Sequence, residues 1–201
     1  VHKENNVLFP AVLALEDAWG VAPPSNAVHI RNASLMAEII QSDLRQTFLF
    51  FAPDFCHDRY AGSPARTATV AAFAPFEGWA HRETLRYSRR IIEIVALLAG
   101  QWPHSSHMTP GGVTAEATAR KIVDGQSLVA EVTRWVEQRL LGGDLEEWLA
   151  LAEELAASGK QIVLSTLALI EAEAELSVLD RQIAHGGFWI GTMGKGAEKD
   201  A

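Results

Sequence analysis

Apolar residues recur every three or four positions along most of this chain, which is the spacing that places them on one face of a helix. The clearest case is Ala80–Ala99, where Leu85, Ile92 and Val95 fall on one face. The same spacing predicts further helices over residues 7–19, 32–51, 114–141, 144–157 and 161–184. No run of alternating apolar and polar residues is long enough to predict a strand. The pattern therefore predicts an all-α fold.

Residues that cap or interrupt helices divide the chain between these segments. Asn32 and Thr114 can each cap the helix that follows it. Residues 52–79 hold three prolines and two glycines with little periodicity, which predicts one long irregular connection. We expect a helical bundle of about five or six helices with one long irregular loop. We expect this bundle to form a single domain over residues 1–185, and the given sequence is either the whole chain or part of a longer one. A flexible glycine-rich tail is expected over residues 186–201.

The most distinctive stretch is residues 100–113, which read Gly-Gln-Trp-Pro-His-Ser-Ser-His-Met-Thr-Pro-Gly-Gly-Val. Its two prolines and its Gly-Gly pair exclude a continuous helix. Trp102, His104 and His107 nevertheless supply the contact area and hydrogen-bonding groups that can pin a turn against a core. We interpret the stretch as an ordered connection between two helices, and we keep these three residues as a candidate binding edge.

A basic cluster occupies the first half of the helix predicted at 80–99. Its members are Arg82, Arg86, Arg89 and Arg90. Arg89 can pair with Glu93 one turn further on, whereas Arg86 and Arg90 repel each other. Two interpretations stay open, a solvated basic face and a docking patch for an acidic partner surface.

Composition excludes several classes of function. The 201-residue chain has a formal net charge of −8, so it offers no basic excess for binding nucleic acid. Its single cysteine, Cys56, excludes an internal disulfide and a Cys-x-x-Cys metal site, and we interpret the adjacent His57 as part of a hydrogen-bonded loop. The longest apolar run, Ile162–Ile170, is much shorter than the ~20 residues of a membrane helix. We predict a cytoplasmic, soluble protein without membrane insertion, metal site or cofactor of its own.

Four stretches, in the same order, resemble the large subunits of nickel–iron hydrogenases. GQWPHSSHMTPGGV is similar to the Gly-x-x-Pro-His segment that runs on to Gly-Gly-Val in the middle of those subunits. ALEDAWGVAPPSNAVHIRN resembles an early helix, a Pro-Pro-x-Asn turn and an Ile-Arg-Asn helix start, and FLFFAPDF resembles a Phe-rich helix end. GGDLEEWLAL resembles a later segment of the cyanobacterial-uptake and sensor branch. Together these stretches span roughly residues 8–150.

The resemblance implies an all-helical large subunit, but the family's ligand positions hold other residues. The family binds its nickel–iron centre through two Cys-x-x-Cys pairs, one near each end of the chain, because such a centre requires soft thiolates. The second cysteine of the first pair aligns with Lys3, and the histidine that commonly follows aligns with Val7. An Asp-His-x-x-His pattern aligns with Ser42–Gln46, which has no histidine. The second cysteine pair would lie beyond Ala201.

This pattern is most like the cysteine-poor hydrogenase expression and formation proteins. We predict a large-subunit-like accessory or scaffold protein, without assigned catalytic residues, whose partners are a hydrogenase subunit or maturation proteins. The alternatives are a fragment of a catalytic large subunit with its cysteines elsewhere, and a helical interaction module; whether the chain forms a homo-oligomer is left open. His104 matches the family's Pro-His position, and Glu16 and Arg31 match family helices without an assigned role.

Overall fold

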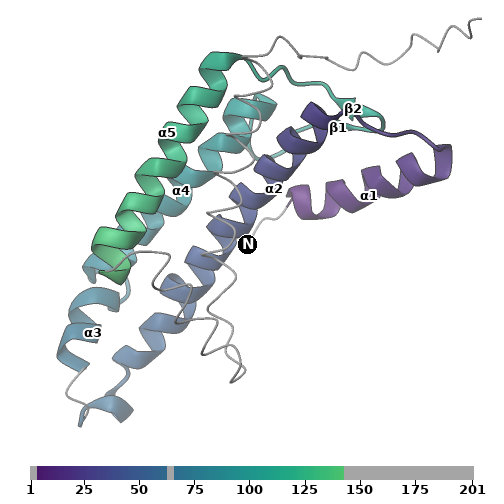
Figure 1. The fold of residues 1–201 in the computed structure, drawn as a ribbon. Helices are drawn as coiled ribbons and strands as arrows, with labels where there is room; N and C mark the ends of the chain where they lie inside the picture. Colours follow the sequence, from purple (N-terminus) through teal and green to yellow (C-terminus); the bar gives the residue numbers. More distant parts are fainter. Residues whose placement is uncertain (1–3, 63–65, 143–201) are drawn as a thin grey trace, which may run out of the picture.

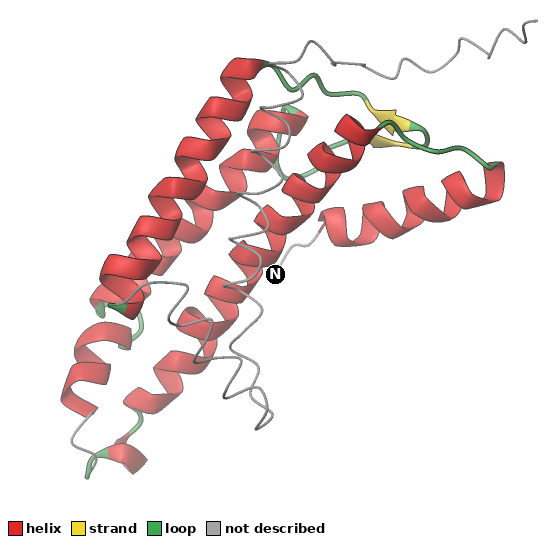
Figure 2. Ribbon diagram, in the orientation of Figure 1, coloured by secondary structure: helices red, strands yellow, loops and turns green. Residues whose placement is uncertain are grey.

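The computed structural model describes residues 4–62 and 66–142, while 1–3, 63–65 and 143–201 lie outside the described residues. Five α-helices and one antiparallel two-stranded ribbon make up most of the described part (Figures 1 and 2). These elements are α1 (Glu4–Trp19), α2 (Ser25–Arg45), α3 (Arg66–Phe73), α4 (Trp79–Ala99), β1 (Met108–Thr109), β2 (Gly112–Val113) and α5 (Ala119–Trp135). Short π-helical or 3-10 turns follow α2 and α5, namely η1 (Gln46–Phe51), η2 (Ala52–Cys56), η3 (Asp58–Tyr60) and η4 (Val136–Leu141).

Three long helices, α2, α4 and α5, form the body of the bundle (Figure 1). α2 packs against α4, and α4 packs against α5, with α4 and α5 antiparallel. Apolar side chains with almost no exposed surface fill these contacts, among them Ile40, Ile91, Ile94, Leu98, Val129 and Val132. Each such side chain stabilises the fold by about 1.5–3 kcal/mol relative to an exposed one. Ile92 and Val95 of the stripe predicted in residues 80–99 lie in this core, whereas Leu85 of the same stripe is 43% exposed.

At one end of the bundle, α1 turns away from α2 at a wide angle (Figure 1). The ribbon β1–β2 lies in the corner between them, in contact with α1 through β1 and with α2 through β2. The chain that connects α4 to α5 is thereby held against the two N-terminal helices. The ribbon residues 108–113 of the distinctive stretch thus lie in this corner, and residues 100–107 connect them to the end of α4.

The predicted all-α fold is confirmed, and the helices expected at 7–19 and 80–99 lie close to their predicted bounds. The ribbon was not predicted, because two-residue strands are too short to show alternation. The loop predicted at 52–79 is less irregular than expected, since it contains α3 and two 3-10 turns. In the described residues, none of the helices has both the length and the apolar character needed to cross a membrane.

Two predicted helix starts are wrong. α2 begins at Ser25 and not at Asn32, because the extended backbone of Pro24 aims its carbonyl at the amides of the first turn. α5 begins after Thr118, whose hydroxyl accepts a hydrogen bond from the Lys121 amide at 3.4 Å. Thr114 instead donates its amide to the His107 carbonyl at 2.8 Å and so extends the ribbon. The helices predicted at 144–157 and 161–184, and the tail at 186–201, lie outside the described residues.

Candidate functional site

A buried ion pair organises the corner between α1, α2 and the ribbon. Arg31 of α2 donates two hydrogen bonds to the carboxylate of Glu16 in α1, from Nη1 to Oε2 at 3.1 Å and from Nη2 to Oε1 at 2.7 Å. The two side chains are only 1% and 5% exposed. Such a two-point contact between guanidinium and carboxylate is both strong and directional. It fixes the relative placement of α1 and α2 at this end of the bundle.

The same two side chains also form hydrogen bonds with the backbone of the turn between β1 and β2. Arg31 donates from Nη2 to the carbonyl of Thr109 at 2.7 Å, and from Nε and Nη2 to the carbonyl of Gly112 at 3.2 and 2.7 Å. Glu16 Oε1 accepts a hydrogen bond from the Gly111 amide at 2.8 Å. We call Glu16 and Arg31, with these contacts to Thr109, Gly111 and Gly112, the loop clamp.

The local sequence makes a turn that fits the clamp. Met108 faces Val113 and Thr109 faces Gly112 across the ribbon, so Pro110 and Gly111 are the central residues of a two-residue turn. Gly111 has φ +87°, a left-handed conformation that residues with a Cβ rarely adopt. This turn directs the Gly111 amide and the neighbouring carbonyls to the ion pair.

The electrostatics of the clamp favour the charged carboxylate. The hydrogen bonds from Arg31 lower the pKa of Glu16, and the Gly111 amide and the positive charge of Arg31 act in the same direction, while burial opposes them. Glu16 therefore stays ionised across the neutral pH range. The clamp holds the loop through fixed charges and is not arranged as a proton donor or acceptor.

The three residues predicted as a binding edge occupy different environments. Trp102 is half-buried and donates from Nε1 to the carboxylate of buried Glu38 in α2 at 3.0 Å. His107 is buried, with 1% of its surface exposed. His104 is exposed at φ +66°, and its carbonyl accepts a hydrogen bond from the Gln101 side chain. Of the three residues, His104 is the most exposed to solvent.

The basic cluster of α4 is divided by the fold. Arg82, Arg86 and Arg89 are exposed on the surface of α4. Arg90 is half-buried and bonds with Glu93 and with Glu131 of α5, and these contacts raise the pKa of Arg90. Arg90 is thus engaged within the bundle, and three of the four predicted docking residues face solvent.

The region around Cys56 forms hydrogen bonds of its own. The Cys56 thiol lies 3.7 Å from the carbonyl of Thr69, and burial raises the pKa of that thiol. His57 Nδ1 accepts a hydrogen bond from the Arg59 amide at 3.1 Å. In the part of the chain that the structure describes, no three His, Cys, Asp or Glu side chains are grouped so that they could hold a metal ion.

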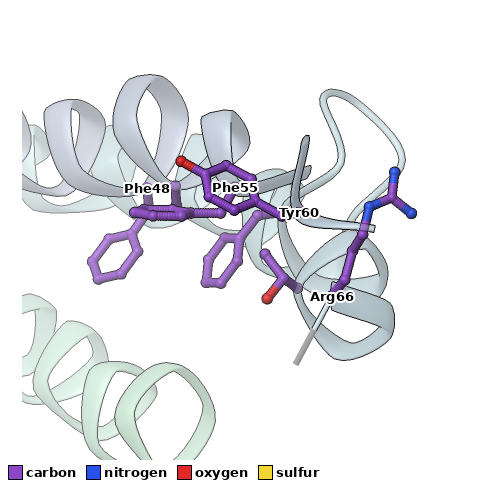
Figure 3. Close-up of a pocket in the computed structure, with 7 residues that line it drawn as sticks. Phe48, Phe55, Tyr60 and Arg66 are labelled. Carbon is purple, nitrogen blue, oxygen red and sulfur yellow. The ribbon is translucent and has the colours of Figure 1, made fainter. Parts of the chain in front are cut away.

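A pocket of about 330 Å³ lies beyond the end of α2, next to α3 (Figure 3). Its walls are mostly aromatic, and its lining residues are Phe48, Ala52, Phe55, Tyr60, Arg66, Thr69 and Phe73. In Figure 3 the guanidinium of Arg66 points away from the rings, and it forms an ion pair with Asp58 at 2.7 Å. Sequence analysis missed this pocket because its walls come from four separate short elements.

Sequence reasoning also left the loop clamp without a role. Glu16 and Arg31 are 15 positions apart, and each could have been an ordinary exposed residue of an amphipathic helix. The only available signal was that both occur in the stretch resembling the hydrogenase family. Their contact depends on the wide angle between α1 and α2, which no local pattern encodes.

No protein-family model matches the chain. The chain is 26% identical over 161 residues to the periplasmic [NiFeSe] hydrogenase large subunit of Desulfomicrobium baculatum, an alignment that covers 73% of the chain. The chain spans about 30% of the length of that relative. The sequence of this chain is accordingly similar to one part of a hydrogenase large subunit.

Proposed function

We propose that this chain is a large-subunit-like protein that acts as an accessory or scaffold in hydrogenase assembly. The observation that carries the proposal is the loop clamp, in which a buried ion pair holds residues 109–112 in one conformation. This loop lies in the stretch that resembles the family's Pro-His and Gly-Gly-Val segment. A loop held in one conformation within this stretch supports the proposal that the chain presents a large-subunit-like surface to its partners.

The donor set of this chain does not fit a nickel–iron centre. Soft thiolates suit such a centre, and the chain has one cysteine, whose thiol has a pKa raised by burial. Lys3 and Val7 stand where the resemblance implies a cysteine and a histidine. A protein that keeps the scaffold without these ligands can recognise the partners of a large subunit without carrying the reaction. Those partners would be a hydrogenase subunit or maturation proteins.

One observation favours a second candidate function. Since the chain spans about 30% of its relative, it is also consistent with a piece of a catalytic large subunit whose thiolates lie elsewhere. In that case the loop clamp would hold one wall of a larger active-site domain. This alternative predicts nickel and iron in the assembled protein, whereas the scaffold proposal does not.

Metal content and partner binding together test the proposal. The full 201-residue chain is expressed with the hydrogenase maturation proteins and with the hydrogenase subunits of its source, and nickel and iron are measured in the purified product. We expect a complex with a large-subunit precursor or a maturation protein, and no stoichiometric metal bound by this chain. Near-stoichiometric nickel and iron in this chain would contradict the scaffold proposal and favour the catalytic alternative.

Two variants, one in the loop clamp and one outside it, test whether partner binding depends on the clamped loop. Arg31→Met breaks the loop clamp, whereas Arg120→Met removes an arginine that is 91% exposed and makes no contact in the clamp. We expect Arg31→Met to lose the complex and Arg120→Met to keep it. Equal binding by Arg31→Met, with a folded bundle by circular dichroism, would show that the clamped loop is not what the partner recognises.

A further inference from the structure

One face of α4 presents basic side chains with an apolar residue between them. Arg82, Leu85, Arg86 and Arg89 are spaced at i, i+3, i+4 and i+7, so they form one stripe along the helix. All four are exposed, and Leu85 leaves 43% of its surface open to solvent. We call these four residues the arginine stripe. An exposed leucine among three arginines is typical of a contact surface for an acidic amphipathic segment.

Two carboxylates near Arg86, those of Glu83 and Glu131, form hydrogen bonds with residues outside the arginine stripe. Glu83 accepts hydrogen bonds from Trp135 Nε1 at 2.7 Å and from Arg139 at 3.1 Å. Glu131 accepts from Arg90 at 2.7 and 3.3 Å. Within residues 4–62 and 66–142, no carboxylate forms an ion pair with an arginine of the stripe. The charge of Arg86 interacts electrostatically with Glu83 and Glu131, but these carboxylates form their direct bonds with other groups, and Arg82 and Arg89 have no carboxylate partner among the ion pairs of the described residues.

The chain leaves the described bundle beside the stripe. α5 runs antiparallel to α4, so the end of η4 lies next to the start of α4 (Figure 1). Two contacts fix this arrangement, the Arg139–Glu83 ion pair and the stacking of Arg139 on Trp79 at 4.9 Å. Gly142 then ends the turn with φ +68°. These contacts hold the end of η4 beside the first turns of α4, where Arg82 lies between Trp79 and Glu83 in the sequence.

The residues that follow in the sequence account for almost all of the protein's net negative charge. Residues 143–201 contain eleven acidic and four basic residues, which is −7 of the formal net charge of −8. The segment 144–157, Asp-Leu-Glu-Glu-Trp-Leu-Ala-Leu-Ala-Glu-Glu-Leu-Ala-Ala, has five acidic residues and no basic one. Its large apolar residues are Leu145, Trp148, Leu149, Leu151 and Leu155. Both the charge and the apolar content complement the arginine stripe.

We propose that segment 144–157 docks on the arginine stripe of its own chain. Its carboxylates meet the guanidinium groups of Arg82, Arg86 and Arg89, and its leucines and tryptophan cover Leu85. Exposed ion pairs are individually weak and are screened by salt, so the apolar contact and the short covalent connection supply part of the attraction. The arginine stripe is then an intramolecular contact, independent of the hydrogenase partners proposed above.

Zero-length crosslinking of the full-length chain tests this docking. Arg82→Lys and Arg89→Lys each keep the positive charge and introduce an amine that a carbodiimide can link to a carboxylate in direct contact. Mass spectrometry then identifies the linked peptides. We expect links from positions 82 and 89 to Asp144, Glu146, Glu147, Glu153 or Glu154, with a yield that falls severalfold in 0.5 M salt.

Two controls make the result decisive. Arg120 lies at the start of α5, at the end of the bundle opposite to the start of α4, and its side chain is 91% exposed. Arg120→Lys should therefore give no link to segment 144–157. Mixing isotope-labelled and unlabelled chains distinguishes links within one chain from links between two copies. Links only between copies, links only to other carboxylates, or a yield equal to that of the Arg120→Lys control would each overturn the proposal.

Discussion

The loop clamp should be among the most sensitive points of the bundle. Arg31→Met removes two hydrogen bonds to Glu16, two to the Gly112 carbonyl and one to the Thr109 carbonyl. It leaves a buried carboxylate whose remaining partner in the clamp is the Gly111 amide. Removing one member of a buried ion pair costs about 3–5 kcal/mol. At about 2–4 °C per kcal/mol for a domain of this size, the expected fall in Tm is roughly 6–20 °C.

The two members of the clamp should differ in their importance. Glu16→Gln keeps an amide oxygen for the Gly111 amide, and Arg31 keeps its bonds to the Thr109 and Gly112 carbonyls. Arg31→Met removes all three connections to the ribbon that Arg31 makes. We therefore expect Glu16→Gln to destabilise less than Arg31→Met. The double variant should be more stable than the sum of the single losses suggests, because neither buried charge is then left alone.

The clamp also predicts a pH dependence of stability. The pKa of Glu16 is lower in the folded protein than its usual value of about 4.3, chiefly because of the hydrogen bonds from Arg31. A lowered folded-state pKa stabilises the fold above the unfolded-state pKa, and this stabilisation is lost as the pH falls through the folded-state pKa. Glu16→Gln should therefore show a weaker loss of stability in acid, below about pH 4.3, than the unaltered chain.

Urea denaturation followed by circular dichroism measures these differences. The free energy of unfolding is compared at constant m-value for the unaltered chain, Glu16→Gln, Arg31→Met and the double variant. Arg120→Met is the control, since its pair with Asp124 is 3.7 Å long and exposed, and it should change stability by less than about 0.5 kcal/mol. A loss below about 1 kcal/mol for Arg31→Met, or simple additivity in the double variant, would refute the argued role of the ion pair.

Three further predictions concern the same loop and the single thiol. Gly111→Ala should destabilise by about 1–2 kcal/mol in thermal unfolding, because φ +87° disfavours a Cβ and that atom would lie 3.2 Å from Val21 Cγ1; Gly111→Asn should cost less than Gly111→Ala if the φ angle dominates. Trp102→Phe removes the donor to buried Glu38 and should cost about 1–3 kcal/mol in urea, and no loss would show that this hydrogen bond is dispensable. Cys56 should react with iodoacetamide at pH 8 more slowly than a free cysteine does, because burial raises its thiol pKa, and an equal rate would contradict that burial.

The arginines of α4 show where sequence reasoning reached its limit. Periodicity placed Arg82, Arg86, Arg89 and Arg90 in one helix, and that placement is confirmed. It could not show that Arg90 reaches Glu131, because that contact depends on how α5 packs against α4. Neighbours on one helix can be counted from the sequence, whereas neighbours across two helices are set by the packing of their cores.

The sequence by itself determined the helical class of the fold, the positions of most apolar stripes and the lack of a cysteine ligand set, because periodicity and composition are local properties. Only the tertiary structure decided how residues distant in the chain combine. It brought Glu16 and Arg31 to the ribbon turn and the aromatic rings of Figure 3 around one pocket. The helix starts were also decided there. α2 begins at Ser25 and α5 at Ala119, because the carbonyl of Pro24 and the hydroxyl of Thr118 accept hydrogen bonds from amides of the first turns. These contacts depend on the angles between helices, and those angles follow from the packing of many side chains together.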